Sequence, residues 1–349
     1  MQKLEKKTQH HLSYILKNLK KTTLSKHHVV LLPDFFVDHF LHLDTIEQVS
    51  KQIQTIHKQG GGNLPGVPQT LSSGGNAANT ALALAKLGIS THLICRTNAL
   101  GYYLLQFFLG QAHVDLSGVK TDGTLALTTA LEFGKQHVNI MLGDPGSVSD
   151  FSYELLDDDD LRRIEQADLV CVVNWNLNTQ GTDLAQNVFK YTKKHGGKTF
   201  FDSGDPSPRK KDIIKLQEKV LKSPHLDIFG LNENELRYYS GHQQSTTKNA
   251  LITAAKTLKK TVHARLDFHT AHFACTLSDT HTIVPTFTPA GIKRTTGAGD
   301  AWNAGDIFGE LLGFTDEDRL HLANLIACYY ISAPYPIHPT IPDLLKFIG

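Results

Sequence analysis

Cysteines, long apolar runs and an excess of charge of one sign are scarce in this sequence. Only four cysteines occur among 349 residues, each inside an apolar stretch and none in a CxxC pair. We expect small buried hydrophobic side chains in a reducing compartment, not a disulfide framework. No apolar run reaches the roughly 18 residues that a membrane span needs, and the first residues lack the apolar core of a signal peptide. The pattern therefore predicts a cytoplasmic protein without a membrane partner.

Neither sign of charge dominates the chain. The 35 Lys and Arg residues nearly balance the 34 Asp and Glu residues, which gives a formal net charge of +1. Nucleic acid is therefore not expected as the main partner. The 19 histidines are spread along the chain without the spacing of a zinc site, so we expect no metal site built on them.

Strand and helix patterns alternate over most of the chain. Short apolar runs such as His28–Leu32 and Leu169–Val173 predict buried strands, and the Ala- and Leu-rich stretch Ala77–Leu87 predicts a helix. Such alternation implies right-handed crossovers and a mostly parallel sheet covered on both faces. We predict one α/β domain over residues 26–349. Residues 1–25 are polar and rich in lysine, and we expect a solvated helical extension.

Two β-rich segments do not fit this wound sheet. One lies near 36–72, and the other spans about 124–146, where the alternation favours a hairpin around Gly134 and Lys135. We predict that these two segments form a small cover over the domain.

The most specific chemical motif is the string TTGAGDAWNAG at residues 295–305. Small residues at Gly297, Ala298 and Gly299 let backbone N–H groups turn toward one point, which the N-terminus of the following helix also faces. Together these groups form an anion hole for a phosphate in transfer. Asp300, at the rim of this hole, can accept the proton of an attacking hydroxyl.

A second motif, GGNAAN, covers residues 74–79. Its two glycines allow close backbone approach, and Asn79 offers both a donor and an acceptor to a polyol. Taken alone, this string favours a glycine turn with a helix cap.

In this order and about 220 residues apart, the two motifs resemble the signatures of the ribokinase-like (PfkB-type) carbohydrate kinases. The first is similar to GGxxxNxA and the second to TTGAGDxFxAG, with Trp302 where Phe is usual. The resemblance implies a three-layer α/β sandwich with a small β lid over the sugar. It also implies Mg²⁺, ATP as phosphate donor and Asp300 as the catalytic base.

The resemblance further implies roles for residues of the acceptor site. Asp38 would bind substrate hydroxyls, and the glycine motif would contribute Gly74, Gly75, Asn76 and Asn79. Asn139 lies at the second lid segment, where it is a further candidate for substrate contact.

Nucleotide and metal roles follow from the same resemblance. Asn232 and Glu235 match an NxxE pattern that would organise magnesium through its waters. Without the resemblance they would be a helix N-cap and a first-turn acid. The remaining nucleotide-binding candidates are Thr296, Gly297, Gly299, Arg265 and Asn324.

Two departures from the family pattern stand out. Arg294 replaces an Asp that helps ribokinase bind a monovalent cation, so potassium activation is in doubt. Arg294 and Lys293 are either a surface basic pair or contacts to the nucleotide phosphates. A strand is predicted over Thr261–Ala264, but no Gly-x-x-Gly loop follows it, so ATP as donor rests on the resemblance.

We therefore predict a phosphotransferase that acts on a hydroxyl of a sugar, sugar acid or related small molecule. A nucleoside kinase is the alternative, and a catalytically silent sugar- or nucleotide-sensing protein is a third. Because an open lid sheet has edges that can pair between subunits, a homodimer also stays open.

Overall fold

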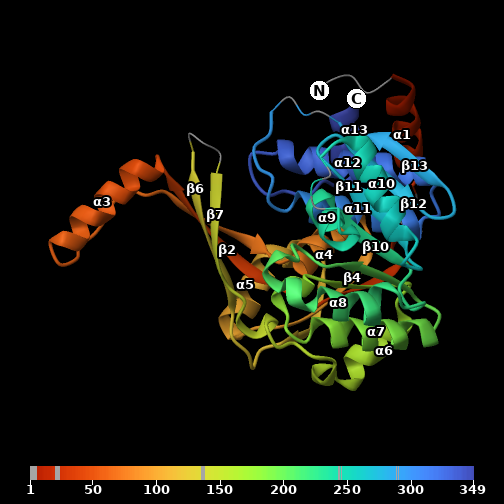
Figure 1. Cartoon of the computed structure of the whole chain (residues 1–349), viewed down its shortest axis with the longest axis horizontal. Coiled ribbons are helices and arrows are strands. Elements are labelled where there is room, and N and C mark those ends of the chain that lie inside the picture. The colour runs from red at the N-terminus through yellow and green to blue at the C-terminus, as the bar shows by residue number, and fades with distance from the viewer. Residues whose placement is uncertain are drawn as a thin grey trace.

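Two sheets of unequal size organise the chain in the computed structural model, which describes residues 6–19, 24–134, 138–242, 244, 246–287, 289 and 291–349 (Figure 1). Within these residues, the larger sheet has nine strands in the order β13-β12-β11-β10-β9-β8-β1-β4-β5. Its strands pair in parallel from β5 to β11, and β12 and β13 add two antiparallel pairs at the edge. The strands are β1 (His28–Leu32), β4 (Ser90–Arg96), β5 (Asp115–Lys120), β8 (Leu169–Val173), β9 (Lys198–Asp202), β10 (Ile228–Asn232), β11 (Arg265–His269), β12 (Phe273–Leu277) and β13 (His281–Pro285).

Helices cover both faces of this sheet. The central strand β8 is buried at every position, with Cys171 facing one hydrophobic cluster and Val170 and Val172 facing the other. The helices are α1 (Lys6–Asn18), α4 (Asn76–Leu87), α5 (Ala99–Leu109), α6 (Asp158–Gln166), α7 (Gly181–Lys194), α8 (Ile213–Leu216), α9 (Glu233–Ser240), α10 (Lys248–Lys259), α11 (Ala298–Leu311), α12 (Asp316–Ser332) and α13 (Ile341–Ile348). The predicted three-layer sandwich is confirmed.

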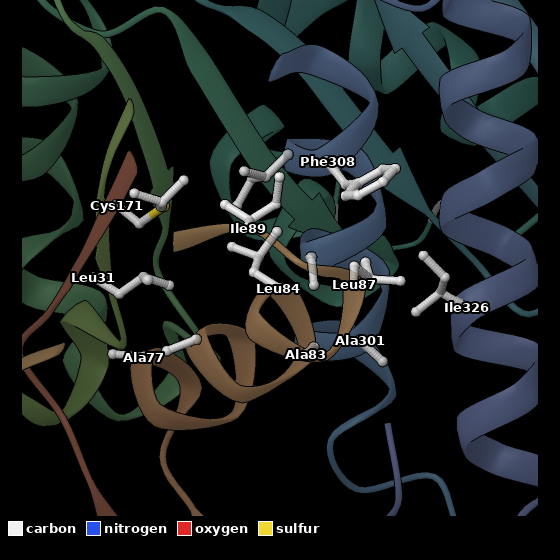
Figure 2. Packing of buried hydrophobic residues seen from close by; sticks show 14 of the residues in the cluster. Leu31, Ala77, Ala83, Leu84, Leu87, Ile89, Cys171, Ala301, Phe308 and Ile326 are labelled. Atoms are coloured by element: carbon white, nitrogen blue, oxygen red, sulfur yellow. The ribbon is translucent and has the colours of Figure 1, made fainter. Parts of the chain in front are cut away.

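Small residues bring the helices of one layer close together. In Figure 2, Ala83 and Leu87 of α4 face Ala301 of α11, and Ile326 of α12 lies behind them. A Cβ added to Gly305 would lie 2.6 Å from the Cα of Ala323, so α11 and α12 approach nearly to backbone contact. This tight packing holds α11, and with it the TTGAGD string, in a fixed position.

The second sheet forms the expected lid. It has the order β3-β2-β6-β7 and contains β2 (Phe36–Leu43), β3 (Gln69–Gly74), β6 (Ala126–Phe133) and β7 (Val138–Asp144). The two β-rich segments therefore join in one sheet, through parallel pairing of β2 with β6. Part of the predicted hairpin turn, including Lys135, lies outside the described residues.

Two expectations differ from the structure in and beside the lid. Between β2 and β3 the chain forms a helix, α3 (Ile46–Lys58), that begins with a capping box of Thr45 and Gln48 and projects beyond the sheet (Figure 1). Helix α1 is not solvated on all sides, because Leu12 and Leu16 are only 2% exposed and join the core cluster beside Ile348. Four-residue spacing placed both leucines on one face, which the dense lysines obscured.

One predicted strand is in the wrong place. The structure has β11 at Arg265–His269, one step after the predicted Thr261–Ala264. The central Asp267 is completely buried, which sequence patterning does not anticipate because an isolated acid normally faces solvent. No helix among the described residues is both long and apolar enough to cross a bilayer.

Candidate active site

Polar side chains gather at the carboxyl ends of the parallel strands, the edge of an α/β sheet where ligands bind. Asp34 follows β1 and Asn174 follows β8, while Asp202, Asn232 and His269 are the last residues of their strands. The N-termini of α4 and α11 reach the same edge, since Asn79 and Asp300 meet there.

Asp300 is held by the glycine motif. It lies in the first turn of α11, is 7% exposed, and accepts a hydrogen bond of 2.9 Å from Asn79 Nδ2 to its Oδ2. Burial raises the pKa of Asp300 well above its usual value, and the negative charge of Asp202 raises it further. Its Oδ1 accepts no hydrogen bond from the described residues, so one carboxyl oxygen is available to take a proton.

The start of α11 offers free backbone donors where an anion hole is predicted, with one change. Gly297 has φ +82°, and a Cβ there would lie 2.5 Å from Tyr330 Oη, so only glycine fits. The N–H of Ala298 donates to the carbonyl of Thr295 at 3.1 Å and is therefore occupied. The N–H groups of Gly299 and Asp300 have no backbone acceptor among the described residues, and they are the free donors at this helix end.

The two glycines of the other motif have separate tasks. A Cβ at Gly74 would lie 2.3 Å from Asp38 Oδ1, so Gly74 makes room for that carboxylate. Gly75 has φ +92°, and its Cβ would come within 2.9 Å of the Cα of Phe35. Both glycines thus serve close approach, as the sequence predicted.

Asp34, which sequence analysis missed, anchors this loop. Its completely buried carboxylate accepts the backbone N–H groups of Asn76 at 2.8 Å and Ala77 at 2.9 Å, and the side-chain amide of Asn174 at 2.7 Å. The backbone of Asn76 therefore supports the loop, and Asn76 is not part of the pocket lining. The position of Asp34 just after the first strand was the signal in the sequence that could have identified it.

A pocket of about 800 Å³ lies between the lid and the loops below it. It brings together five of the predicted site residues, Asp38, Asn79, Asn139, Thr296 and Gly297. Asp38 comes from the lid strand β2 and is 9% exposed. Burial raises its pKa to about 6, although a hydrogen bond from Thr128 opposes that change.

Asn232 and Glu235 form a tight cap at the start of α9. Glu235 accepts the backbone N–H of Asn232 at 2.8 Å and its side-chain amide at 2.6 Å, while Asn232 Oδ1 accepts the N–H of Glu235 at 3.1 Å. Glu235 is 3% exposed, and burial together with the charge of Asp202 raises its pKa well above the usual value. Asp202 itself accepts a hydrogen bond of 2.6 Å from Asn303.

These oxygen donors suit Mg²⁺ in kind, because carboxylates and amide oxygens are the ligands that this ion prefers. The unrelieved negative charge of Asp202 and Glu235 also favours a cation nearby. No group of three or more His, Cys, Asp or Glu side chains in the described part of the chain is placed to hold a metal directly.

Comparison with known proteins agrees with this geometry. Residues 50–344 match the family model described as pfkB family carbohydrate kinase. The chain belongs to this family, and it is a kinase.

Individual relatives are more distant. The kinase is 26% identical over 301 residues to the 5-dehydro-2-deoxygluconokinase of Geobacillus thermodenitrificans (strain NG80-2), over 79% of this chain and 83% of the relative. Its fold is similar to that of Arabidopsis thaliana ribokinase in complex with ribose and ATP, with a TM-score of 0.73, 20% identity and coverage of 93% and 99% of the two chains. The adenosine kinase of Sinorhizobium meliloti gives 0.73 and 18%, over 93% of this kinase and 98% of that chain.

Arg265 does not reach the active site of the kinase. It is paired with Ile228 at the start of β10, whereas His269 is paired with Asn232 at the site. Four residues of strand separate the two ends by about 13 Å. Arg265 instead donates to Asp267 at 2.8 Å and to Glu310 at 2.5 Å. The expected nucleotide contact fails because the strand begins at Arg265, four residues later than predicted, so that Arg265 lies at the amino end of the strand and not in the loop after it.

Asn324 is 3% exposed and committed to internal bonds. Its oxygen accepts the indole N–H of Trp302 at 2.9 Å, and its amide donates to the carbonyl of Pro285 at 3.1 Å. Trp302, the departure from the usual Phe, thus has its polar atom satisfied by Asn324.

His269 is a site residue that sequence analysis did not select. Its ring stacks on Trp302 with centroids 4.8 Å apart, and its Nε2 is the closest atom, at 3.8 Å, to a Cβ built on Gly299. Burial lowers its pKa to about 4, so the imidazole is neutral beside the anion hole. The misplaced strand concealed it, because His269 is the last residue of β11.

Proposed function

We propose that this kinase transfers the terminal phosphate of ATP to a hydroxyl group of a sugar or sugar-derived small molecule. The observation that carries the proposal is the Asn79–Asp300 contact of 2.9 Å beside the free N–H groups at the start of α11. A base and an anion hole are there within one helical turn, next to a pocket lined by polyol-binding groups.

In this mechanism the acceptor lies between the lid and the base of the pocket. Asp38 and Asn79 hold its hydroxyls, and the Oδ1 of Asp300 takes the proton of the attacking oxygen. The raised pKa of Asp300 makes it a stronger base than an exposed aspartate, provided that it is ionised in the complex. The N–H groups of Gly299 and Asp300 stabilise the charge that develops on the transferred phosphoryl group.

Magnesium would be held through water by Asn232 and Glu235, beside Asp202. When bound, it neutralises charge on the phosphate oxygens. Asn232 and Glu235 would themselves position the hydrated ion, because Glu235 is fixed by two hydrogen bonds from Asn232.

The donor and the acceptor class are supported by relatives. The structural neighbour from Arabidopsis is a complex with ribose and ATP, and the relative from Geobacillus is named for a gluconate derivative. A nucleoside acceptor is the second candidate, because aromatic side chains that can stack on a base line the pocket: Phe40, Phe133, Tyr330 and Tyr335.

The test is release of ADP by the purified full chain, with Mg²⁺-ATP and a panel of sugars, sugar acids and nucleosides. We expect ADP release that depends on one acceptor class and is lost in Asp300→Asn. Ligand binding without any acceptor-dependent turnover would favour the sensing protein instead.

The lid also supports a homodimer. Its strands β3, β6 and β7 expose Leu71, Leu127, Met141 and Leu142, which are between 43% and 57% accessible. Pairing of these surfaces between two subunits would cover them, and the mass of the protein in solution tests this arrangement.

A further inference from the structure

The pocket wall opposite the lid carries a cation that no acid neutralises. Arg294 and Lys293 both line the pocket that holds Asp38 and Asn79. Neither has a carboxylate within ion-pair distance among the described residues. Sequence analysis left this pair as a surface feature or a nucleotide contact, whereas the structure places it on the acceptor pocket.

Arg294 is held rigidly in this position. Its Nη2 donates to the carbonyl of Pro334 at 2.9 Å, and its guanidinium carbon lies 5.9 Å from the centroid of the Tyr330 ring. The neighbouring backbone is tied down as well, since the N–H of Lys293 donates to the carbonyl of Ile331 at 2.8 Å. A preorganised guanidinium loses little entropy when a ligand binds.

One part of this guanidinium has an unfilled bonding capacity. Nη1 of Arg294 is buried and has no hydrogen-bond partner among the described residues. Leaving such a donor unpaired costs free energy, which a ligand acceptor would recover. The side chain as a whole is partly exposed, so the unpaired donor is Nη1 and not the entire guanidinium.

The acids of the pocket are engaged elsewhere. Burial lowers the pKa of Arg294 and the charge of Glu132 opposes this change, but the Glu132 carboxylate is itself paired with His42 Nδ1 at 2.9 Å. Asp38 packs over Gly74 and is directed to the acceptor hydroxyls. The protein therefore provides carboxylates for hydroxyl groups and a free cation for something else.

We propose that the acceptor carries an anionic group, the carboxylate of a sugar acid or a phosphate, and that Arg294 pairs with it. This inference rests on the proposed function and narrows its acceptor class. The planar guanidinium matches a carboxylate or phosphate oxygen pair in geometry and charge. Arg294 shares one pocket with Asp38, Asn79 and Asn139, whereas Asn232 and Glu235 lie outside that lining, so the acceptor is favoured over the nucleotide as the source of the anion.

The experiment compares acceptors that differ in one charged group: gluconate with glucose, ribonate with ribose, and fructose 1-phosphate with fructose. Each is measured by kcat/KM with saturating ATP and by the shift in melting temperature without ATP. The variants are Arg294→Gln, Arg294→Lys and, as a matched control outside the pocket, Arg162→Gln. Arg162 is 66% exposed and paired with Asp159.

We expect the wild-type kinase to prefer the charged member of at least one pair by about 10- to 100-fold. Arg294→Gln should abolish this preference while leaving the neutral member and the KM for ATP unchanged. Arg294→Lys should keep part of it, and Arg162→Gln should keep all of it. The acid and phosphate pairs decide which anion is recognised.

Two results would overturn the inference. One is equal use of charged and neutral acceptors by the wild type. The other is a rise in the KM for ATP in Arg294→Gln with the acceptor preference intact, which would assign Arg294 to the nucleotide. If no acceptor is phosphorylated, the proposed function fails, but the melting shifts still decide whether Arg294 binds an anion.

Discussion

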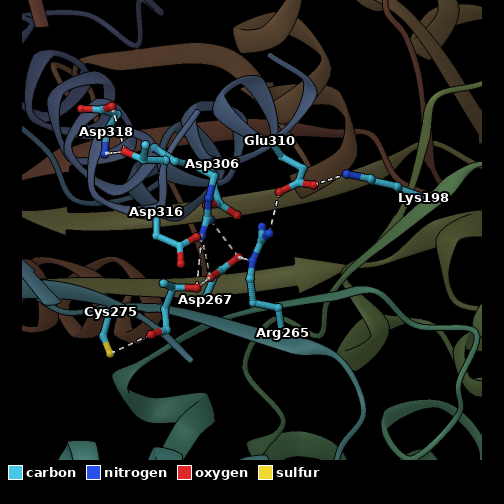
Figure 3. Close-up of polar contacts among 11 residues, drawn as sticks. Lys198, Arg265, Asp267, Cys275, Asp306, Glu310, Asp316 and Asp318 are labelled. Atoms are coloured by element: carbon cyan, nitrogen blue, oxygen red, sulfur yellow. Dashed lines mark hydrogen bonds and ion pairs between the residues drawn. The ribbon is translucent and has the colours of Figure 1, made fainter. Parts of the chain in front are cut away.

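Two clusters of buried ionisable side chains lie along β11 and α11, one at the carboxyl ends of the strands and one around Asp267 in the middle of β11, and they differ in how their charge is balanced. At the active-site end, Asp202, Glu235 and Asp300 have no basic partner among the described residues. In the other cluster, Asp267 is paired with Arg265 and Arg319, and Asp306 is paired with Arg319. Figure 3 shows Arg265, Asp267 and Asp306 in this cluster.

The cluster around Asp267 is connected by many hydrogen bonds and ion pairs. Arg319 is 1% exposed and donates to four side chains, Asp267, Thr276, Asp306 and Asp316. Glu310 bridges Arg265 and Lys198 (Figure 3). Although burial alone would raise the pKa of Asp267, the charges of Arg319 and Arg265 lower it to about 2.

The contrast shows what each cluster is for. Asp267 and Glu310, which are paired with arginines, have a lowered pKa, whereas burial raises the pKa of Asp306 to about 7 even though it faces Arg319. These pairs join α11 and α12 to the sheet, so they contribute to stability. Acids without a basic partner have a raised pKa and cost stability, which is typical of groups that act on a ligand. The same helix, α11, is therefore held by ion pairs in its second half, and its first turn carries the unpaired acid that we propose as the base.

Asp300→Asn should show the largest effect, because it changes the proposed base in the cluster without basic partners. The amide keeps a bond to Asn79 but cannot take a proton, so we expect turnover to fall by about 10²- to 10⁴-fold. The melting temperature should hold or rise, because a buried carboxylate is removed. Steady-state kinetics and thermal melts of the same preparation check both, and near-normal turnover would exclude Asp300 as the base.

Arg319→Met removes a central cation of the paired cluster and should lower stability, not turnover. Removal of the guanidinium leaves Asp306 buried without its cation, which should lower the free energy of unfolding by about 3–5 kcal/mol. Turnover per folded molecule should change little, since no site residue bonds to Arg319. Urea unfolding measures the loss, with Arg162→Met as the exposed control. An unchanged unfolding midpoint would show that the network is not stabilising.

Glu235→Gln tests whether the cluster without basic partners takes part in holding Mg²⁺. The amide fills the same space but removes the charge beside Asp202, so we expect the concentration of Mg²⁺ needed for half-maximal rate to rise about 10-fold. Stability should not fall as it does in Arg319→Met. A titration of Mg²⁺ at saturating ATP is the measurement, and an unchanged midpoint would remove Glu235 from the metal site.

The pH dependence of acceptor binding should show the smallest effect. Asp38 has a pKa of about 6 and accepts hydroxyl hydrogen bonds when ionised, so the acceptor KM should fall as pH rises through about 6 and then level off. The paired Asp267, with a pKa of about 2, does not titrate in this range. Asp38→Asn should give a higher KM without this slope. If the slope survives in that variant, it belongs to another group.

Much of the scaffold was predictable because its signals are local. The strands His28–Leu32 and Leu169–Val173 match their predicted bounds, since the apolar runs end there at Pro33 and Asn174. The TTGAGD and GGNAAN strings marked the loops where Asp300 and Asn79 lie. Their contact, which joins residues 221 positions apart, was not predicted.

The remaining differences have a common physical cause. Arg265 is a plausible phosphate ligand in one dimension, but pairing with Asp267 and Glu310 holds it at the wrong end of its strand. Asp34 was overlooked because its partners are backbone N–H groups more than 40 positions away. The partners of a charged side chain depend on which groups the fold brings next to it.

The sequence by itself therefore determined the wound α/β scaffold, the lid segments and the reactive first turn of α11, because these follow from periodicity and short motifs. Tertiary structure alone decided which charged groups are neutralised. Coulomb energy and desolvation depend on distances between side chains far apart in the chain. Those distances separate the acids that are paired with arginines from Asp202, Glu235 and Asp300, which have no basic partner among the described residues, and they place Arg294 on the wall of the pocket.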